Sequence, residues 1–241
     1  MRRKKHTIYP VISVPVLIIL YLYTAVTVFI VLMLSYLKWK SAVFAVMGFW
    51  AKSIFPIMGK RLRIKGKDNF DRNRKYILLA NHASMFDIMA IMAFFPHVSW
   101  FGHERLLKVP LFGRMLLMTD YIPMTMANIR NTRRMVEQLV DKSNARTIAI
   151  FPEGTRTLNG KINPFYRGFI YLLRASETDI LPVTLNGFFR LKPKNRSYIN
   201  FGAKLEVIIH EPIPGKQLVD MEDKKIIDQV KSVIESASGG S

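Results

Sequence analysis

The sequence predicts an α/β fold: a mostly parallel central sheet flanked by helices, preceded by an apolar two-helix segment. Three observations predict it. Short apolar runs alternate with longer segments of helical periodicity through most of the chain, which is typical of strand–helix–strand units. Several of these runs are apolar at nearly every position, as expected for parallel strands covered on both faces. The N-terminal residues instead form long apolar stretches without the alternation of a half-buried strand.

The first apolar stretch is long enough to cross a membrane. No charged residue occurs in the 31 residues from Thr7 to Leu37, which argues against a helix of a soluble bundle. Residues 16–37 alone would form a helix of about 33 Å, at about 1.5 Å per residue, against a hydrocarbon core of about 30 Å. We expect Pro10 and Pro15 to disturb the beginning of this helix, because proline cannot donate a backbone hydrogen bond.

A second apolar helix is expected over Ser41–Gly59, where Lys52 is the single charged residue. Residues 38–40, Lys-Trp-Lys, would form the turn between the two helices. We therefore interpret residues 1–63 as a helical segment that is embedded in a membrane and anchors the chain to it.

Charge is distributed unevenly along the chain. The net charge is +19, and residues 1–67 contain 12 Lys or Arg and no acidic residue. Because Lys and Arg favour the cytoplasmic side of a membrane, a hairpin that keeps the basic clusters 2–5 and 60–67 together is preferred to a single span that would separate them. We expect the chain to bind the anionic headgroups of a cell inner membrane or another cytoplasm-facing membrane, with its catalytic domain on the cytoplasmic side.

Residues 64–237 are predicted to form one α/β domain. Strands are expected where apolar residues follow one another between polar turns, and helices where they recur every three or four positions. The expected strands are 76–80, 98–101, 121–126, 147–150, 180–185, 199–201 and 205–211. The expected helices are 84–95, 110–118, 128–141, 165–175 and 221–236. Residues 238–241, Ser-Gly-Gly-Ser, are expected to be an unstructured tail or the remnant of a tag.

A histidine and an aspartate lie five residues apart just after the first of these strands. His82 and Asp87 follow residues 76–80, where the next helix begins. Asp87 can accept a hydrogen bond from one ring nitrogen of His82, which leaves the other nitrogen free to take a proton from a hydroxyl group. The alternative is structural: with Ser84 as N-cap and Asp87 three residues later, the same residues form a capping box that requires no catalysis.

A second motif, Phe-Pro-Glu-Gly-Thr-Arg at residues 151–156, follows the strand 147–150. Gly154 permits a tight turn. Arg156 carries a planar guanidinium suited to a phosphate or carboxylate group. Glu153 can bond to backbone N–H groups or hold the loop that carries His82. Alone this is an ordinary turn, but together with the histidine–aspartate spacing it indicates a functional site.

With these two motifs, the chain resembles the glycerophospholipid acyltransferase family, typified by the 1-acylglycerol-3-phosphate acyltransferases, over residues 76–187. His82 and Asp87 match the family's His-x-x-x-x-Asp motif, and residues 151–156 match its Phe-Pro-Glu-Gly-Thr-Arg motif. Residues 108–113 and 180–183 are similar to two further motifs of the family. The resemblance implies a membrane-bound enzyme of phospholipid biosynthesis. In such an enzyme a fatty acyl group would pass directly from the co-substrate, acyl-CoA or acyl carrier protein, to the free hydroxyl of a lysophospholipid. No cofactor would take part.

The resemblance also implies roles for individual residues. His82 would be the general base and Asp87 its partner. Residues at the second motif would bind the acceptor and its phosphate: Glu153, Gly154, Thr155 and Arg156.

The chain departs from the family pattern in two places. Thr125-Met126 stands where family members usually carry Asp-Arg, and His103-Glu104-Arg105 stands where paired lysines are common. Arg130 is the arginine nearest to the displaced position, and Arg167 lies where the family often has a basic residue near the acceptor; both are candidate substrate-binding residues. The alternative for Arg167 is a solvated charge on a helix, and an exposed helix face is the favoured interpretation of the cluster that contains Arg130. The expected acceptor is 1-acylglycerol-3-phosphate or a related lysolipid.

Other classes of site find no support in the sequence. The chain has no cysteine, which excludes disulfides and a thiolate nucleophile. Its five histidines show no metal-ligand spacing, and no metal is predicted. Two alternatives remain: a lipid ester or thioester hydrolase whose dyad activates water, and a protein that binds anionic lipid without catalysis. Nucleic acid is not an expected partner, because the excess charge accompanies the apolar segment.

Overall fold

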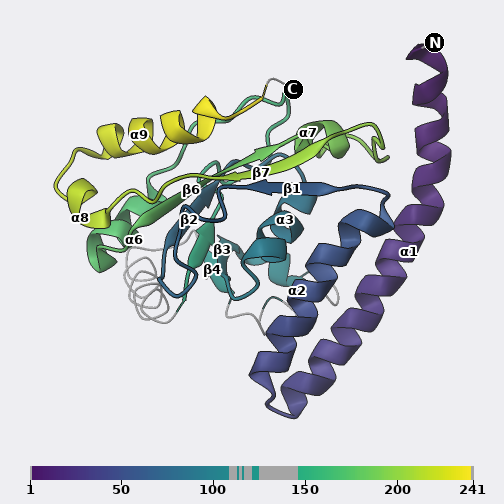
Figure 1. Cartoon of the computed structure of the whole chain (residues 1–241), viewed down its shortest axis with the longest axis horizontal. Coiled ribbons are helices and arrows are strands. Elements are labelled where there is room, and N and C mark those ends of the chain that lie inside the picture. The colour runs from purple at the N-terminus through teal and green to yellow at the C-terminus, as the bar shows by residue number, and fades with distance from the viewer. Residues whose placement is uncertain (1, 109–112, 114–115, 117–120, 125–145, 240–241) are drawn as a thin grey trace.

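A central sheet organises the chain in the computed structural model, which describes residues 2–108, 113, 116, 121–124 and 146–239. Within these residues the sheet has seven strands in the order β1-β7-β6-β2-β5-β3-β4 (Figure 1). The strands are β1 Leu62–Lys65, β2 Ile77–Ala80, β3 Ser99–His103, β4 Ile122–Met124, β5 Ile148–Ile150, β6 Ile180–Asn186 and β7 Leu205–Ile209.

The sheet is mostly parallel, as the sequence predicts. β6 and β7 form its antiparallel pair, and the other neighbours run parallel. Leu79 of β2 is in register with Ile150 of β5 and with Pro182 of β6. The loops that follow these three central strands therefore leave the sheet at the same edge, which in α/β folds is where binding and catalytic groups gather.

Helices cover both faces of the sheet. Leu78 and Ala80 face the side of the N-terminal helices and α3, whereas Ile77 and Leu79 face the side of α6 and α9. The helices are α1 Arg2–Tyr36, α2 Lys40–Ile57, α3 Phe86–Phe94, α6 Gly168–Ser176, α7 Phe188–Leu191, α8 Gly215–Leu218 and α9 Asp223–Ser236, with a 3₁₀ turn at Glu104–Lys108.

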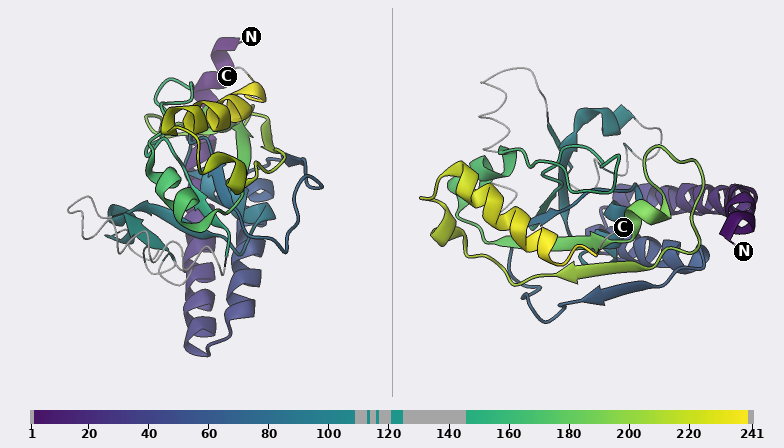
Figure 2. Two further views of the ribbon diagram at one scale, coloured as in Figure 1. Left: turned by 90° about the vertical axis from the view of Figure 1, so that its left-hand side faces the viewer. Right: turned by 90° about the horizontal axis from the view of Figure 1, so that it is seen from above.

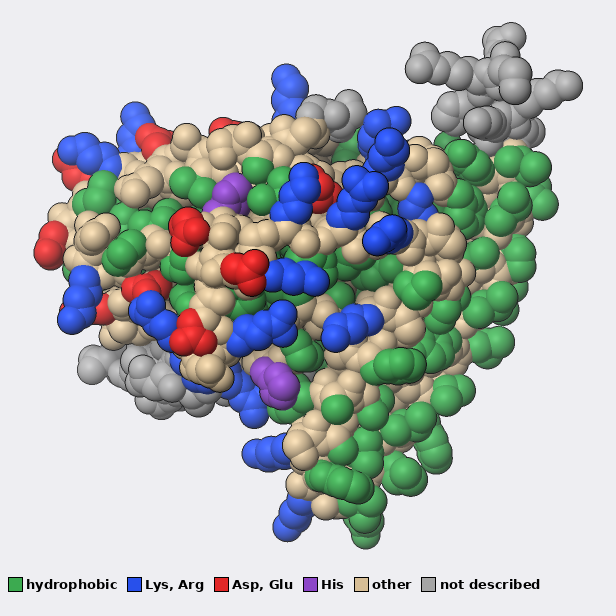
Figure 3. Space-filling model, viewed as in Figure 1, with side chains coloured by type: hydrophobic (Ala, Val, Ile, Leu, Met, Phe, Trp, Pro, Cys, Tyr) green, Lys and Arg blue, Asp and Glu red, His purple; other side chains and the backbone are tan. Residues whose placement is uncertain are grey.

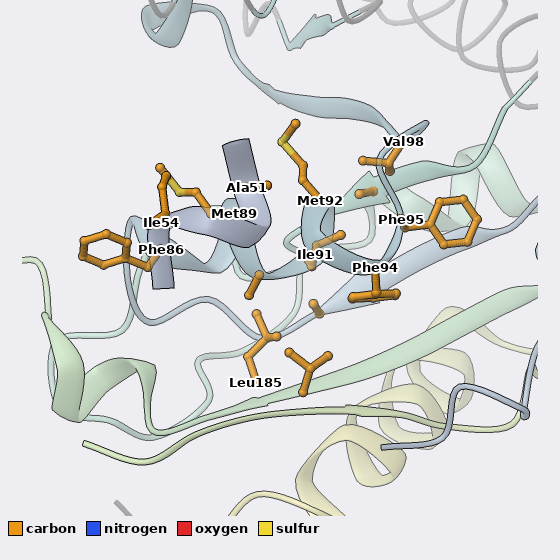
Figure 4. Packing of buried hydrophobic residues seen from close by; sticks show 14 of the residues in the cluster. Ala51, Ile54, Phe86, Met89, Ile91, Met92, Phe94, Phe95, Val98 and Leu185 are labelled. Carbon is orange, nitrogen blue, oxygen red and sulfur yellow. The ribbon is translucent and has the colours of Figure 1, made fainter. Parts of the chain in front are cut away.

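The larger core cluster joins α2 and α3 to the sheet. Figure 4 shows Ala51 and Ile54 of α2 beside Met89 and other side chains of α3, above Leu185 of β6. α3 is apolar around most of its circumference because it lies between α2 and the sheet. This packing fixes the beginning of α3, which starts at Phe86, four residues after His82.

The two N-terminal helices form an antiparallel hairpin whose far end projects beyond the α/β domain (Figure 2). Two inter-helix hydrogen bonds link them: Tyr23 Oη to Ser53 Oγ at 2.6 Å, and Trp50 Nε1 to Thr24 Oγ1 at 3.1 Å. The predicted turn at residues 38–40 is confirmed to within one residue. The expected disturbance by the two prolines is not observed, because α1 continues through Pro10 and Pro15.

One helix of the described residues, Ile8–Tyr36, is long and apolar enough to cross a membrane, and 22% of its most apolar window is buried within the protein. Its outer surface is apolar as well, and forms the green right-hand side of Figure 3. Val11, Tyr21 and Phe29 are 71%, 68% and 69% exposed. α2 has a different environment, because Trp50, Ile54 and six other residues of this helix are buried.

Three parts of the sequence prediction need correction or comment. The strand expected at residues 199–201 is wrong: the Ile199 N–H donates to Ser13 Oγ of α1 at 2.9 Å, and this segment therefore packs on the N-terminal helix. β1 was not predicted, and the proposed boundary between residues 63 and 64 falls inside it. The helix expected at 128–141 and most of that at 110–118 lie outside the described residues.

Candidate active site

His82 and Asp87 form a hydrogen-bonded pair at the edge of the sheet where β2 ends. His82 Nδ1 lies 2.8 Å from Asp87 Oδ2. The side chain of His82 is 16% exposed and that of Asp87 is fully buried. Nε2 of His82 makes no hydrogen bond within the described part of the chain, so this ring nitrogen is available to a substrate.

One carboxylate oxygen of Asp87 bonds both to the ring of His82 and to the backbone just before α3. Oδ2 of Asp87 also accepts hydrogen bonds from the backbone N–H groups of Ala83 at 2.6 Å and Ser84 at 2.8 Å. An oxygen that accepts from two N–H groups is an acceptor for the ring as well, so Nδ1 of His82 carries the proton and Nε2 has the lone pair a base needs. Asp87 therefore bonds back to the Ser84 N–H as the acid of a capping box would, while it also holds the ring of His82.

The predicted N-cap is not the one observed. α3 begins at Phe86, and its N-cap is Met85, without a side-chain cap bond. Ser84 lies one residue earlier, and its Oγ donates to the carbonyl of Lys192 at 2.7 Å. Ser84 therefore ties the loop of the dyad to the segment that follows α7.

Asn81 anchors the same loop to the neighbouring strand. Its Nδ2 donates to the carbonyl of Leu185 at 3.1 Å, and its Oδ1 accepts from the N–H of Leu185 at 2.7 Å. The side chain thus replaces a backbone partner beyond the end of β2 and satisfies both polar groups of a buried residue of β6. His82 is held by this anchor on its N-terminal side.

The second motif, residues 151–156, and Thr157 just after it form hydrogen bonds with the backbone of His82. Oε1 of Glu153 accepts from the His82 N–H at 2.6 Å, and the Thr157 N–H donates to the His82 carbonyl at 2.9 Å. The other carboxylate oxygen of Glu153 accepts from the Asn163 N–H at 2.8 Å. Glu153 therefore holds the histidine loop, one of the two roles considered from the sequence.

The ring of His82 is supported by an aromatic stack. Phe151 lies parallel to it at a centroid distance of 4.0 Å, with an interplanar angle of 12°. Trp100 of β3 stacks on Phe151 in turn, at 5.5 Å. Gly154 then turns the chain with a φ of 65°, where a side chain would be strained. The motif that follows β5 thus contacts both the ring and the backbone of His82.

Burial gives Glu153 unusual proton affinity. Its carboxyl group is 1% exposed, and this burial raises its pKa to about 7. The backbone N–H groups of His82 and Asn163 oppose the shift by stabilising the carboxylate, and the negative charge of Asp87 adds to it. The group is therefore poised to change protonation near neutral pH.

A cavity of about 920 Å³ opens beside His82, at the ends of β2 and β6. Four basic residues line it together with His82: Arg63, Lys161, Arg190 and Lys204. Three acidic residues border it as well: Glu153, Glu206 and Glu235. The cavity can thus admit an anionic molecule to Nε2 of His82.

The other predicted site residues lie in different places. Thr155 and Arg156 border a second cavity of about 510 Å³, which Glu153 also borders. Arg167 is exposed at the beginning of α6 and lines neither of these two cavities. Arg130 lies outside the described residues. No group of three or more His, Asp or Glu side chains suited to a metal ion occurs in the part of the chain described.

Two residues of the site were not assigned roles from the sequence. Asn81 stands next to His82 in the motif, but its pairing with Leu185 depends on the neighbouring strand. Lys192 lies near Arg156: burial lowers its pKa, and the charges of Arg156 and Arg196 lower it further. In the sequence, the basic residues at every second position, 192, 194 and 196, were the feature that could have indicated a role for Lys192.

Comparison with known families identifies the family of the chain. The profile of the family described as Acyltransferase matches residues 61–186, which is more than half of the chain and includes both motifs. The chain belongs to the Acyltransferase family. The resemblance stated from the two motifs is thereby confirmed at the level of the family.

Several relatives of this acyltransferase carry the name 1-acyl-sn-glycerol-3-phosphate acyltransferase. One from Cocos nucifera is 28% identical over 182 residues, which cover 73% of this chain and 56% of that protein. One from Borreliella burgdorferi is 28% identical over 184 residues, covering 74% and 72%. The chloroplastic BAT2 of Brassica napus is 24% identical over 76% of this chain and 55% of its own length. The chain thus spans about half the length of the plant relatives it matches.

A solved structure has the same fold. The 1-acyl-sn-glycerophosphate (LPA) acyltransferase PlsC from Thermotoga maritima superposes with a TM-score of 0.82, covering 97% of this chain and all of that chain. The two sequences are 22% identical, so the likeness concerns the fold. Because the superposition covers 97% of this chain, the similarity in fold includes the hairpin as well as the α/β domain.

Proposed function

We propose that this acyltransferase transfers a fatty acyl group from an acyl thioester to the free hydroxyl of a lysophospholipid, 1-acylglycerol-3-phosphate or a related lipid, in phospholipid biosynthesis. The observation that carries the proposal is the pair formed by His82 Nδ1 and Asp87 Oδ2 at 2.8 Å, with the ring of His82 lining a cavity. The names of the relatives support the same substrate class.

The reaction follows from the protonation state of His82. Nε2 takes the proton of the acceptor hydroxyl while the hydroxyl oxygen attacks the thioester carbonyl. A C–O bond forms, the C–S bond breaks, and the thiolate leaves with the proton that Nε2 returns. Asp87 stabilises the imidazolium formed in between, because its carboxylate already accepts the Nδ1 hydrogen bond. No acyl-enzyme intermediate is required.

Positive charge near the dyad would bind the phosphate groups of the substrates. We assign Arg156, which borders the cavity of about 510 Å³, to the acceptor phosphate, the role expected for it. Lys192 adds positive charge nearby, while its Nζ donates to the carbonyl of Arg196 at 2.9 Å. Arg167 and Arg130 remain predicted contacts. The basic lining of the cavity at His82 would serve acyl-CoA or acyl carrier protein, both anionic.

We further propose that the hairpin embeds the enzyme in a cell inner membrane or another cytoplasm-facing membrane, with the catalytic domain on the cytoplasmic side. The exposed apolar surface of α1 supports membrane insertion, because exposed apolar area of this extent is rare on a soluble monomer. The cluster at residues 60–67, which extends into β1, would lie against anionic headgroups.

An acyl-transfer assay tests the function. Purified protein in detergent would receive one labelled acyl-CoA or acyl carrier protein thioester and a panel of lysolipids, in parallel with a sample lacking any acceptor. We expect diacyl product from 1-acylglycerol-3-phosphate and little free fatty acid. Product formed only from other lysolipids would mean that the acceptor is one of those lipids and not 1-acylglycerol-3-phosphate. Free fatty acid formed without an acceptor would contradict acyl transfer and indicate a hydrolase.

A further inference from the structure

A third cavity, of about 610 Å³, lies at the opposite edge of the sheet from His82. Lys75 and Thr147 line it just before β2 and β5, and His97 lines it just before β3. His82 follows the other end of β2, so the length of the strand separates the two cavities. Nothing in the proposed reaction uses this third cavity.

Among the described residues, its lining is basic and none of them contributes a carboxylate. Five lysine and arginine residues contribute to it: Lys40, Arg72, Arg74, Lys75 and Arg146. Asp179 pairs with Arg74 nearby. Among the described residues, no ion pair is formed by Lys40, Arg72 or Lys75. Lys40, Arg72 and Lys75 therefore line the cavity with no ion-pair partner in the described part of the chain. Figure 3 shows basic side chains on the surface between the hairpin and the α/β domain.

The back of the cavity is fixed by packed rings. Phe44 lies 4.9 Å from the ring of His97, and the guanidinium of Arg146 lies 4.5 Å from the centroid of the same Phe44 ring. Burial lowers the pKa of His97, and the charges of Arg146 and Lys75 lower it further, which reports a positive potential at this point. The cavity is thus a shaped site for an anion.

The beginning of α2 adds to this potential. α2 has 18 residues, starts at Lys40 on the rim of the cavity, and has no side-chain cap bond at Trp39. The partial positive charge of a helix N-terminus favours a phosphate, although the N–H of Lys40 itself donates to the carbonyl of Lys38 at 3.1 Å. The N-terminus of α2 and the basic side chains therefore both contribute positive potential to the same cavity.

The position of the cavity beside the hairpin turn identifies the source of the phosphate. Tyr36 and Trp39 at this turn are 87% and 60% exposed, and Lys38 and Lys40 flank Trp39. Aromatic and basic residues in this combination are typical of the headgroup region of a bilayer. We propose that this cavity binds the phosphate of an anionic glycerophospholipid headgroup; the assignment to a lipid rests on the proposed membrane association.

Lysine labelling tests the proposal on the full chain in a neutral detergent. Acetylation rates of individual lysines would be measured by mass spectrometry while dihexanoylphosphatidylglycerol is added, because this anionic lipid differs from the phosphatidic acid that 1-acylglycerol-3-phosphate would give. Near ten times Kd, labelling of Lys40 and Lys75 should fall about tenfold, while Lys216 and Lys224 serve as exposed internal references. Dihexanoylphosphatidylcholine and inorganic phosphate at equal concentrations should protect neither lysine.

Charge reversal gives a matched control. Arg72→Glu with Lys75→Glu changes two exposed side chains of the cavity and should abolish the protection of Lys40, whereas Lys216→Glu with Lys224→Glu should leave it unchanged. Absence of protection, equal protection by phosphatidylcholine, or equal protection by inorganic phosphate would each overturn the proposal. Because the readout does not involve acyl transfer, loss of the proposed function would leave this test intact.

Discussion

Glu153 holds His82 by its backbone: Oε1 of the buried carboxylate lies 2.6 Å from the amide nitrogen of His82. The other oxygen bonds to the Asn163 N–H, so both oxygens are occupied within the protein. The resemblance implied that this glutamate binds the acceptor's phosphate. From its contacts we infer a positioning residue, which acts on the substrate through His82.

Two substitutions at Glu153 separate these roles. Glu153→Ala removes the acceptor of the His82 N–H and should lower kcat about 10²-fold, because small displacements of a catalytic group are costly, with little change in KM for the acceptor. Glu153→Gln keeps an oxygen for His82 and should retain more activity than Glu153→Ala. Steady-state kinetics with varied acceptor would measure both. A large rise in KM with kcat preserved would instead favour direct phosphate binding.

The stability of the enzyme should depend on pH through the same carboxyl group. Its pKa rises from 4.5 to about 7 on folding, so between these values the folded state binds more protons than the unfolded state. Stability from this group is complete below pH 4.5 and falls as pH rises to about 7, by about 3 kcal/mol. Thermal unfolding in detergent across this range would show the decline, and Glu153→Gln should make it shallower. Identical slopes in the two proteins would contradict the assignment.

Asn81 should be important for stability. Asn81→Ala leaves the N–H and carbonyl of Leu185 without partners inside the protein, at about 1–3 kcal/mol for each buried group. Asn186→Ala is a matched control, because Asn186 makes a similar pair of bonds to Ala237 and Gly239 at a more exposed site. Denaturant unfolding should show the larger loss for Asn81→Ala; an equal or smaller loss would mean that the anchor to β6 contributes little.

Ser13 should connect α1 to the loop that follows α7. Its Oγ accepts from the Ile199 N–H, so Ser13→Ala leaves this N–H without a partner. Hydrogen exchange at Ile199 should become faster by about tenfold or more, corresponding to about 1–3 kcal/mol for a lost buried bond. Ser53→Ala, which removes the bond to Tyr23 within the hairpin, should leave Ile199 unchanged. Unaltered exchange in Ser13→Ala would show that this contact does not hold the loop.

The sequence predicted most of the central sheet because its strands are buried on both faces. β2 and β5 are apolar at every position, which is an unambiguous signal. β1 was missed because Leu62 and Ile64 alternate with Arg63 and Lys65, and its charges were assigned to the membrane surface. The apolar segment at Ile199 was taken for a strand, although its partner is Ser13, 186 residues away.

The catalytic pair of the site was likewise easier to predict than the hydrogen bonds that hold it in place. The spacing of His82 and Asp87 is local, and one turn of chain brings the two side chains together. The supports come from partners 71 residues away in Glu153 and 104 residues away in Leu185. Which backbone group each partner meets depends on strand order and register, and neither is fixed by local pattern.

Replacement of His82 tests the central claim most directly. Acyl transfer from labelled acyl-CoA or acyl carrier protein thioester to 1-acylglycerol-3-phosphate would be measured for the wild-type enzyme and for His82→Ala, with thermal unfolding of both as the control for folding. We predict that kcat falls by at least about 10²-fold, because the general base is lost, while the unfolding temperature changes little. Turnover by a folded His82→Ala enzyme at the wild-type rate would contradict the account.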